Sequence, residues 1–158
     1  MYKRSIRNYI LEALKDTPVV LLNGARQTGK TTLVKSLLEK EINGKYFTFD
    51  EASVLSAAKS DPLGFIEGLT GPVVLDEIQH ALELLPAIKA SVDRKRKPGR
   101  FLLTGSANIM LLPKVSESLA GRVEIVTLWP LSQSEMAGKN TSLVDQLFDE
   151  GPDRQKYP

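Results

Sequence analysis

The residues with the clearest capacity for chemistry lie near the start of the chain, in the run Gly24-Ala25-Arg26-Gln27-Thr28-Gly29-Lys30-Thr31. This run matches the P-loop pattern G-x-x-x-x-G-K-[ST] in full. Gly24 and Gly29 allow a tight turn and a close approach of the backbone to phosphate oxygens. Successive N–H groups of such a loop, together with the N-terminus of the helix that follows, bind an anionic phosphate.

The individual P-loop positions have distinct expected roles. Lys30 is expected to reach the β- and γ-phosphates, and the Thr31 hydroxyl to bind Mg²⁺. The neighbouring Thr32 is placed to reach the α-phosphate. Arg26 is either a further phosphate contact or an ordinary exposed arginine of the loop. The sequence therefore predicts a site for ATP and Mg²⁺ whose nucleotide-binding residues are Gly24, Ala25, Arg26, Gln27, Thr28, Gly29, Lys30, Thr31 and Thr32.

A pair of carboxylates follows a second apolar run, Val73-Val74-Leu75-Asp76-Glu77. In open α/β sheets, ligands bind at the carboxyl ends of the strands, which is where both acids would lie. Asp76 is then expected to hold Mg²⁺, directly or through water, and Glu77 to act as the general base for an attacking water. The alternative is a helix N-cap with an acidic first turn, which the presence of the P-loop makes less favoured.

Hydroxyl residues end another apolar run, Phe101-Leu102-Leu103-Thr104-Gly105-Ser106. Either Thr104 or Ser106 is a candidate for contacting the γ-phosphate or the attacking water, and the sequence does not choose between them. The alternative is a turn whose hydroxyl groups are satisfied locally.

Basic residues further along the chain have weaker signals. Arg122 is a candidate arginine finger, acting on the nucleotide of a neighbouring subunit in a homo-oligomer; its alternative is a surface ion pair. The run Arg94-Lys95-Arg96-Lys97 can contact nucleic-acid phosphates, but it also suits a helix C-terminus, where cations are favoured. The latter interpretation is preferred, because no aromatic residues accompany the cluster. His80 is expected to make polar packing contacts.

These residues must be positioned by alternating strands and helices. Strands are predicted at residues 18–23, 45–50, 72–76, 100–104 and 123–128, and helices at 30–42, 51–59, 62–69, 84–96 and 115–120. Shorter helices are expected near 134–136 and 143–148, and an exposed tail over 151–158. An amphipathic helix is expected at the N-terminus. The alternation indicates a parallel α/β sheet.

Composition restricts the possible functions. The 158 residues carry a formal net charge of +2, contain no cysteine, and include one histidine, which excludes thiolate chemistry and histidine-rich metal sites. Apolar runs are far shorter than the ~20 residues of a membrane span. A cytoplasmic protein without membrane contact is the expectation.

Together these blocks resemble the ATPase domain of prokaryotic AAA-type ATP-binding proteins, relatives of archaeal-type ATPases. The resemblance covers about residues 2–135 and also includes Ser118-Leu119-Ala120-Gly121-Arg122 and Trp129-Pro130-Leu131-Ser132. It implies a three-layer P-loop NTPase sandwich with a five-stranded parallel sheet in the order 5-1-4-3-2. Such proteins usually carry a C-terminal domain of poorly defined function, so this chain is expected to correspond to their N-terminal ATPase part.

The resemblance also fixes the expected domains and activity. Residues 1–135 would form the ATPase domain, and residues 136–158 a truncated C-terminal extension. The expected activity is Mg²⁺-dependent ATP hydrolysis coupled to a conformational change. The alternative is a nucleotide-gated module that binds a protein or DNA with negligible turnover. A small-molecule kinase is disfavoured, because neither an acceptor pocket nor an arginine-rich lid is evident.

Overall fold

The structure is a computed structural model that describes residues 4–111 and 113–136. The chain divides into two compact units, one of residues 6–130 and another whose described residues are 4–5 and 131–136. The larger unit contains every candidate site residue. The predicted boundary near residue 135 stays a prediction.

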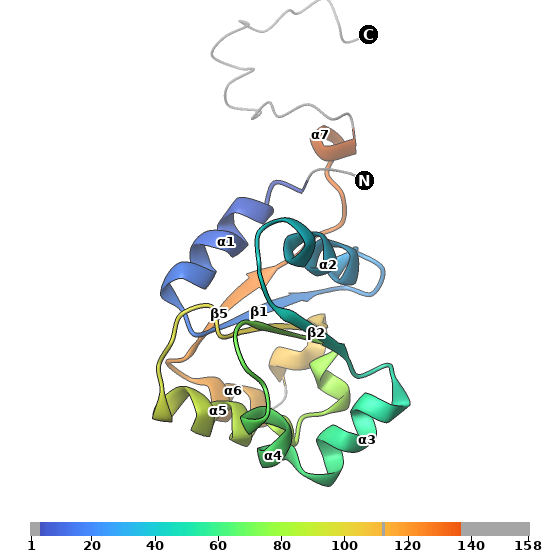
Figure 1. Cartoon of the computed structure of the whole chain (residues 1–158). Coiled ribbons are helices and arrows are strands. Elements are labelled where there is room, and N and C mark those ends of the chain that lie inside the picture. The colour runs from blue at the N-terminus through green and yellow to red at the C-terminus, as the bar shows by residue number, and fades with distance from the viewer. Residues whose placement is uncertain (1–3, 112, 137–158) are drawn as a thin grey trace, which may run out of the picture. The chain divides into compact units, whose positions relative to one another are not determined.

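The larger unit is built on one five-stranded sheet in which all paired strands are parallel, in the order β2-β3-β4-β1-β5 (Figure 1). This is the predicted order, 5-1-4-3-2, read from the other edge. The strands are β1 (Val19–Gly24), β2 (Lys45–Thr48), β3 (Val73–Asp76), β4 (Phe101–Ser106) and β5 (Val123–Thr127).

Burial along the strands explains why their sequences are so apolar. Every residue of β1 and of β3 is buried, as expected of parallel strands covered on both faces. The edge strands β2 and β5 are only partly buried and carry more polar residues. On β1, alternate residues enter different cores: Val19 and Leu21 pack in one cluster, Val20 and Leu22 in the other.

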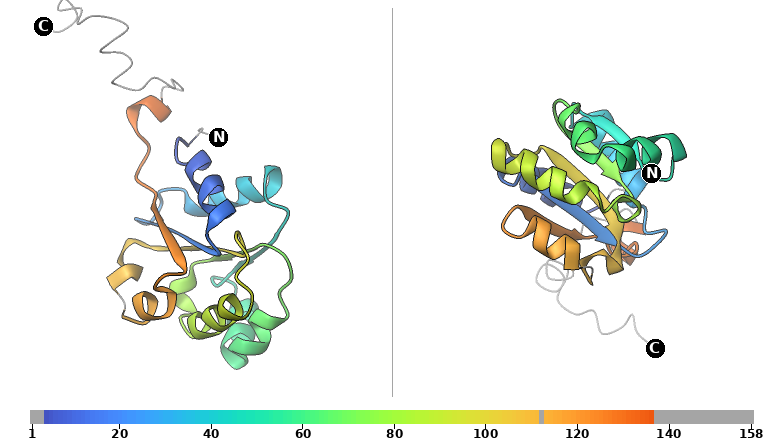
Figure 2. Two further views of the ribbon diagram at one scale, coloured as in Figure 1. Left: turned by 90° about the vertical axis from the view of Figure 1, so that its left-hand side faces the viewer. Right: turned by 90° about the horizontal axis from the view of Figure 1, so that it is seen from below.

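Helices cover both faces, which gives the predicted three layers (Figures 1 and 2). One face is covered by α1 (Arg7–Asp16) and α2 (Lys30–Lys40), through Ile10, Leu33, Val34 and Leu37. The other face is covered by α3 (Ala52–Ser60), α4 (Pro62–Glu67), α5 (Leu84–Arg94) and α6 (Pro113–Leu119). Asp61 caps α4 by accepting a hydrogen bond from the Gly64 N–H at 2.9 Å, with Pro62 at the first helical position.

Two short 3₁₀ helices, η1 (Ile78–His80) and η2 (Ala107–Leu111), were not predicted, and both directly follow candidate site residues. The strand predicted at 45–50 ends earlier, at Thr48, where the pairing with β3 stops. Conversely, β4 continues to Ser106, because Gly105 and Ser106 still pair with Asn23 and Gly24.

The smaller unit has one described helix, α7 (Gln133–Met136). Its start is a capping box: the Ser132 hydroxyl accepts from the Glu135 N–H at 3.2 Å, and the Glu135 carboxylate accepts from the Ser132 N–H at 3.0 Å. The helix predicted at 143–148 and the tail at 151–158 lie outside the described residues. Within the described ranges, no helix has the length and apolarity to span a membrane.

Candidate functional site

The P-loop connects the buried strand β1 to helix α2 at the carboxyl edge of the sheet. Gly24 must be a glycine, because a Cβ there would lie 2.5 Å from the Leu128 carbonyl oxygen. Gly29 precedes α2 with φ of 90°, in the left-handed region that favours glycine. Thr28 closes the loop internally, its hydroxyl donating to the Ala25 carbonyl at 2.9 Å.

The ammonium group of Lys30 lies inside the curve of this loop. The residue is only 5% exposed, and Nζ donates to the carbonyl oxygens of Gly24 at 3.0 Å and Ala25 at 2.9 Å. A buried lysine surrounded by backbone turns is a concentrated positive charge. Arg26 in this loop and Thr32 in the first turn of α2 are both exposed.

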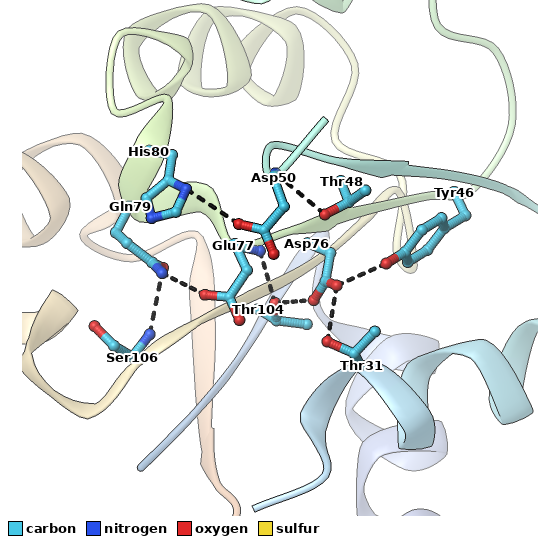
Figure 3. Close-up of polar contacts among 10 residues, drawn as sticks. All are labelled: Thr31, Tyr46, Thr48, Asp50, Asp76, Glu77, Gln79, His80, Thr104 and Ser106. Carbon is cyan, nitrogen blue, oxygen red and sulfur yellow. Dashed lines mark hydrogen bonds and ion pairs between the residues drawn. The ribbon is translucent and has the colours of Figure 1, made fainter. Parts of the chain in front are cut away.

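Asp76 is the centre of the polar network at this edge (Figure 3). It is 1% exposed, and its Oδ2 accepts from the Thr31 hydroxyl at 2.9 Å and from the Tyr46 hydroxyl at 2.7 Å. Its Oδ1 accepts from the Thr104 hydroxyl. The structure thus brings together Thr31, Asp76 and Thr104, which the sequence placed in three separate motifs.

Tyr46 is a member of this network that sequence reasoning missed. It lies on β2, opposite Val74 of β3, and its ring packs against the core beneath α1 and α2. Burial, and secondarily its hydrogen bond to Asp76, raise the pKa of the Tyr46 hydroxyl well above its usual value, so it remains a donor. A single tyrosine in an edge strand carries no motif, so the only available signal was the β2–β3 pairing.

Glu77 has a backbone conformation that is uncommon for a residue other than glycine, with φ of 59° and ψ of 47°. Its N–H donates to Thr104 Oγ1 at 2.9 Å, and its carboxylate accepts from the Gln79 side-chain amide. Gln79 in turn accepts from the Ser106 N–H at 3.3 Å. Conformations of this kind concentrate at functional sites, because the surrounding structure must hold them in place.

Thr104 and Ser106 occupy different environments, although both end β4. Thr104 is fully buried, and its hydroxyl both donates to Asp76 and accepts from Glu77. Ser106 is half-buried and pairs in register with Gly24, the first residue of the P-loop. Of the two, Ser106 is therefore the residue beside the phosphate-binding loop.

Arg122 lies at the amino ends of the strands, because it comes directly before β5. The P-loop lies at their carboxyl ends, because it follows β1, which is parallel to β5. Its guanidinium forms a two-pronged contact with Asp93 of α5, with Nε–Oδ1 at 2.6 Å and the second nitrogen–oxygen distance at 2.9 Å. This pairing lowers the pKa of the Asp93 carboxyl. Within its own chain, Arg122 thus forms the surface ion pair that was the alternative to a finger.

The basic cluster is partly engaged in contacts within the chain. Arg94 pairs with Glu67 at 2.9 Å, and Arg96 donates to the Gly121 carbonyl at 3.2 Å. Lys95 and Lys97 line a surface pocket of about 330 Å³ between the ends of α4 and α5. Nucleic-acid contact here stays a prediction.

The lone histidine lies close to an acid. His80 Nδ1 is 3.4 Å from Asp50 Oδ1, at an exposed position that agrees with the expected polar packing (Figure 3).

The donor set fits a Mg²⁺–nucleotide. Mg²⁺ prefers oxygen ligands and is commonly held by one or two protein groups together with phosphate oxygens. Thr31 Oγ1 and Asp76 Oδ2 lie 2.9 Å apart, directly beside the loop that contains Lys30. Among the described residues, no group of three or more His, Asp or Glu side chains could hold a metal alone.

A parallel sheet in this order, with a glycine-rich loop between β1 and α2 and an aspartate ending β3, defines a P-loop NTPase fold of the AAA type. Residues 16–137 match the AAA domain family, and the chain belongs to that family.

Two mycobacterial proteins are similar to this chain in sequence. Uncharacterized proteins from Mycobacterium tuberculosis and Mycobacterium bovis are each 39% identical over 150 residues, covering 94% of this chain. The chain spans about a third (33%) of the length of these relatives.

Two solved structures share the fold at 17% identity. The Walker-type ATPase PABY2304 of Pyrococcus abyssi has a TM-score of 0.59, covering 90% of this chain and 60% of its own. The P-loop NTPase domain of an Escherichia coli sigma-54 transport activator has a TM-score of 0.54, covering 80% of this chain and 93% of its own.

Proposed function

We propose that this domain binds ATP with Mg²⁺ at the P-loop and hydrolyses it to ADP and phosphate. The observation that carries the proposal is the hydrogen bond between Thr31 and Asp76, which joins the P-loop helix to the end of β3. It brings the two candidate metal-binding residues together, with Glu77 next in the chain. Membership of the AAA domain family supports nucleotide binding independently.

Each residue has a role that its position supports. Lys30 neutralises the β- and γ-phosphates, and the loop N–H groups with the N-terminus of α2 hold the phosphate chain. Thr31 and Asp76 would hold Mg²⁺, which would supply further charge neutralisation on the triphosphate. Glu77 orients a water for in-line attack on the γ-phosphate and takes its proton.

The two hydroxyl residues at the end of β4, Thr104 and Ser106, have different roles. Thr104 positions Asp76 and the backbone of Glu77, because its hydroxyl is already used by both. Ser106, which pairs with Gly24, is the residue that responds to the γ-phosphate. Movement of this strand end on hydrolysis is the conformational change that we propose.

Arg122 acts, in this proposal, on the nucleotide of a second subunit. It lies at the amino ends of the strands, and its own P-loop lies at their carboxyl ends. Arg122 can therefore reach only a nucleotide that is bound to another subunit. The contact with Asp93 must open for that to happen.

The test is steady-state phosphate release from Mg-ATP over a range of protein concentrations. Glu77→Gln should abolish turnover while nucleotide binding persists, and Glu39→Gln, the same change at an exposed position of α2, should leave it intact. Specific activity that rises with protein concentration, and that is lost in Arg122→Ala, would support the trans role. Turnover no higher than in Glu77→Gln would refute autonomous hydrolysis.

The second candidate is a nucleotide-gated binding module with negligible turnover. It is favoured by one contact: the Glu77 carboxylate is already held by Gln79. In this case Mg-ATP binding by calorimetry would be tight, while phosphate release would equal that of Glu77→Gln.

A further inference from the structure

Gln79 connects the candidate general base to the end of β4. Its Nε2 donates to Glu77 Oε2, and its Oε1 accepts from the Ser106 N–H at 3.3 Å (Figure 3). We propose that Gln79 is a positioning residue that couples Ser106, the last residue of β4, to the carboxylate of Glu77. This inference rests on the proposed role of Glu77 in hydrolysis.

The two partners of Gln79 fix the orientation of its amide. A carboxylate can only accept a hydrogen bond and a backbone N–H can only donate one. The amide therefore satisfies both neighbours in one orientation, with nitrogen toward Glu77 and oxygen toward Ser106. A reversed amide would place its oxygen against the Glu77 carboxylate and its NH₂ group against the Ser106 N–H. Two restraints of opposite polarity thus select one arrangement of the side chain.

The local backbone presents Gln79 in the required direction. The left-handed conformation of Glu77 turns the chain out of β3 into η1, where Ile78 is fully buried and anchors the turn. Figure 3 shows Glu77 and Gln79 on the same side of this turn, toward the end of β4. Glu77 and Gln79 are both only partly buried, so their carboxylate and amide remain near solvent.

Glu77 is consequently held by β4 in two ways. Its backbone N–H is bound by Thr104 Oγ1 at 2.9 Å, and its carboxylate is bound through Gln79 by the N–H of Ser106. A carboxylate is planar, so fixing one oxygen also restricts the direction of the other. Because Ser106 pairs with Gly24, a phosphate that shifts Ser106 at the P-loop would also shift Gln79 and the carboxylate of Glu77.

A structural role alone predicts a different outcome from a positioning role. A partly exposed side-chain hydrogen bond contributes little to stability, so loss of Gln79 should change the melting temperature only slightly. Misplacing a catalytic group by about 1 Å can reduce the rate roughly a hundredfold, while substrate affinity is unaffected. A positioning role therefore predicts a lower kcat with KM and the melting temperature nearly unchanged. A purely structural role predicts no selective loss of kcat.

The experiment compares Gln79→Leu and Gln79→Glu with Gln133→Leu, the same change at an exposed residue of α7. We expect Gln79→Leu to lower kcat about ten- to a hundredfold with KM for Mg-ATP changed less than about threefold. Gln79→Glu keeps the shape but removes the donor and sets two carboxylates together, so kcat should fall at least as far.

A second readout needs no turnover. In the nucleotide-free chain, the Ser106 amide should exchange its hydrogen about five- to tenfold faster in Gln79→Leu than in the wild type, because its acceptor is gone. An unchanged Ser106 rate would overturn the bridge, whether or not the chain hydrolyses ATP.

The remaining outcomes also decide the proposal. Wild-type turnover with an unaltered kcat in Gln79→Leu would overturn the coupling and leave the proposed hydrolysis standing. A fall in kcat together with an equal proportional rise in KM would indicate general damage to the site, and would also overturn the proposed coupling. Wild-type turnover no higher than in Glu77→Gln would refute hydrolysis, and the coupling with it, while faster Ser106 exchange would still establish the contact.

Discussion

Replacing Thr104 by valine should destabilise the fold even in the absence of nucleotide, because one hydroxyl serves two partners. Thr104 is fully buried; its hydroxyl donates to Asp76 Oδ1, and its oxygen accepts from the Glu77 N–H at 2.9 Å. Valine has nearly the same shape, so no cavity is created and the loss reports on the hydroxyl alone.

The magnitude follows from the two partners. Asp76 keeps two donors on Oδ2, from Thr31 and Tyr46, so its buried charge loses one charge-assisted bond, worth about 1.5–3 kcal/mol. The N–H of Glu77 belongs to a half-buried residue, so water can replace the Thr104 oxygen as its acceptor. Loss of this hydrogen bond is expected to cost about 0.5–1 kcal/mol. The expected destabilisation is therefore about 2–4 kcal/mol, a fall in melting temperature of roughly 4–16 °C for a domain of this size.

Thermal unfolding of the nucleotide-free protein, followed by circular dichroism, measures this change. Thr48→Val is the comparison variant, because the half-buried Thr48 hydroxyl accepts from the Asp50 N–H at 3.3 Å, and its other partner is the Tyr46 side chain rather than a buried carboxylate. It should cost less than about 1 kcal/mol, and Thr104→Ser should restore most of the stability. A Thr104→Val variant that melts within about 2 °C of the wild type, or no lower than Thr48→Val, would refute the reasoning.

Three further predictions follow from other contacts. Lys30→Ala should weaken Mg-ATP binding at least about tenfold by calorimetry, because the loop loses the charge that faces the phosphates; unchanged affinity would contradict a P-loop site. The pKa of Asp93 is lowered by Arg122, so its contribution to stability is present above the unfolded pKa of about 4 and is lost as the pH falls through the lower folded value. Asp93→Asn should accordingly lower the urea midpoint at pH 7, and the gap to the wild type should close in acid; a gap that is independent of pH would exclude the ion pair as its cause. If duplex DNA binds the basic cluster, replacing Lys95 and Lys97 by alanine should reduce the slope of log affinity against log salt by about 2, and an identical slope would place binding elsewhere.

The fold could be predicted from sequence to the extent that it depends on local pattern. The continuous apolar runs that became β1, β3 and β4 belong to strands buried along nearly their whole length, and such runs are typical of parallel strands covered on both faces. Strand ends were less accurate, because β2 stops where its pairing with β3 stops, which depends on tertiary register. The strand order itself came from the family resemblance.

The site could be predicted only where its residues form a motif. Spacing identifies the P-loop because each glycine and the lysine have fixed positions relative to one phosphate. Tyr46 has no such spacing, and the position of Gln79 two residues after Glu77 does not indicate that it binds Ser106. Tyr46 reaches Asp76 across 30 positions of sequence, and Gln79 reaches Ser106 across 27. Contacts of this kind depend on which strands are neighbours, information that a single sequence does not contain.

The hydroxyl groups around Asp76 also limit how that residue can take part in metal binding. A carboxylate offers about four acceptor sites on its two oxygens. Three of them are used here, by the hydroxyls of Thr31, Tyr46 and Thr104. About one acceptor site then remains, enough for one further donor such as a water bound to the cation, unless a hydroxyl leaves. Thr31 is itself a candidate ligand, whereas Tyr46 and Thr104 are anchored on β2 and β4. The arrangement therefore favours a single-point contact from Asp76, with Thr31 as the group that is free to change partner when nucleotide binds.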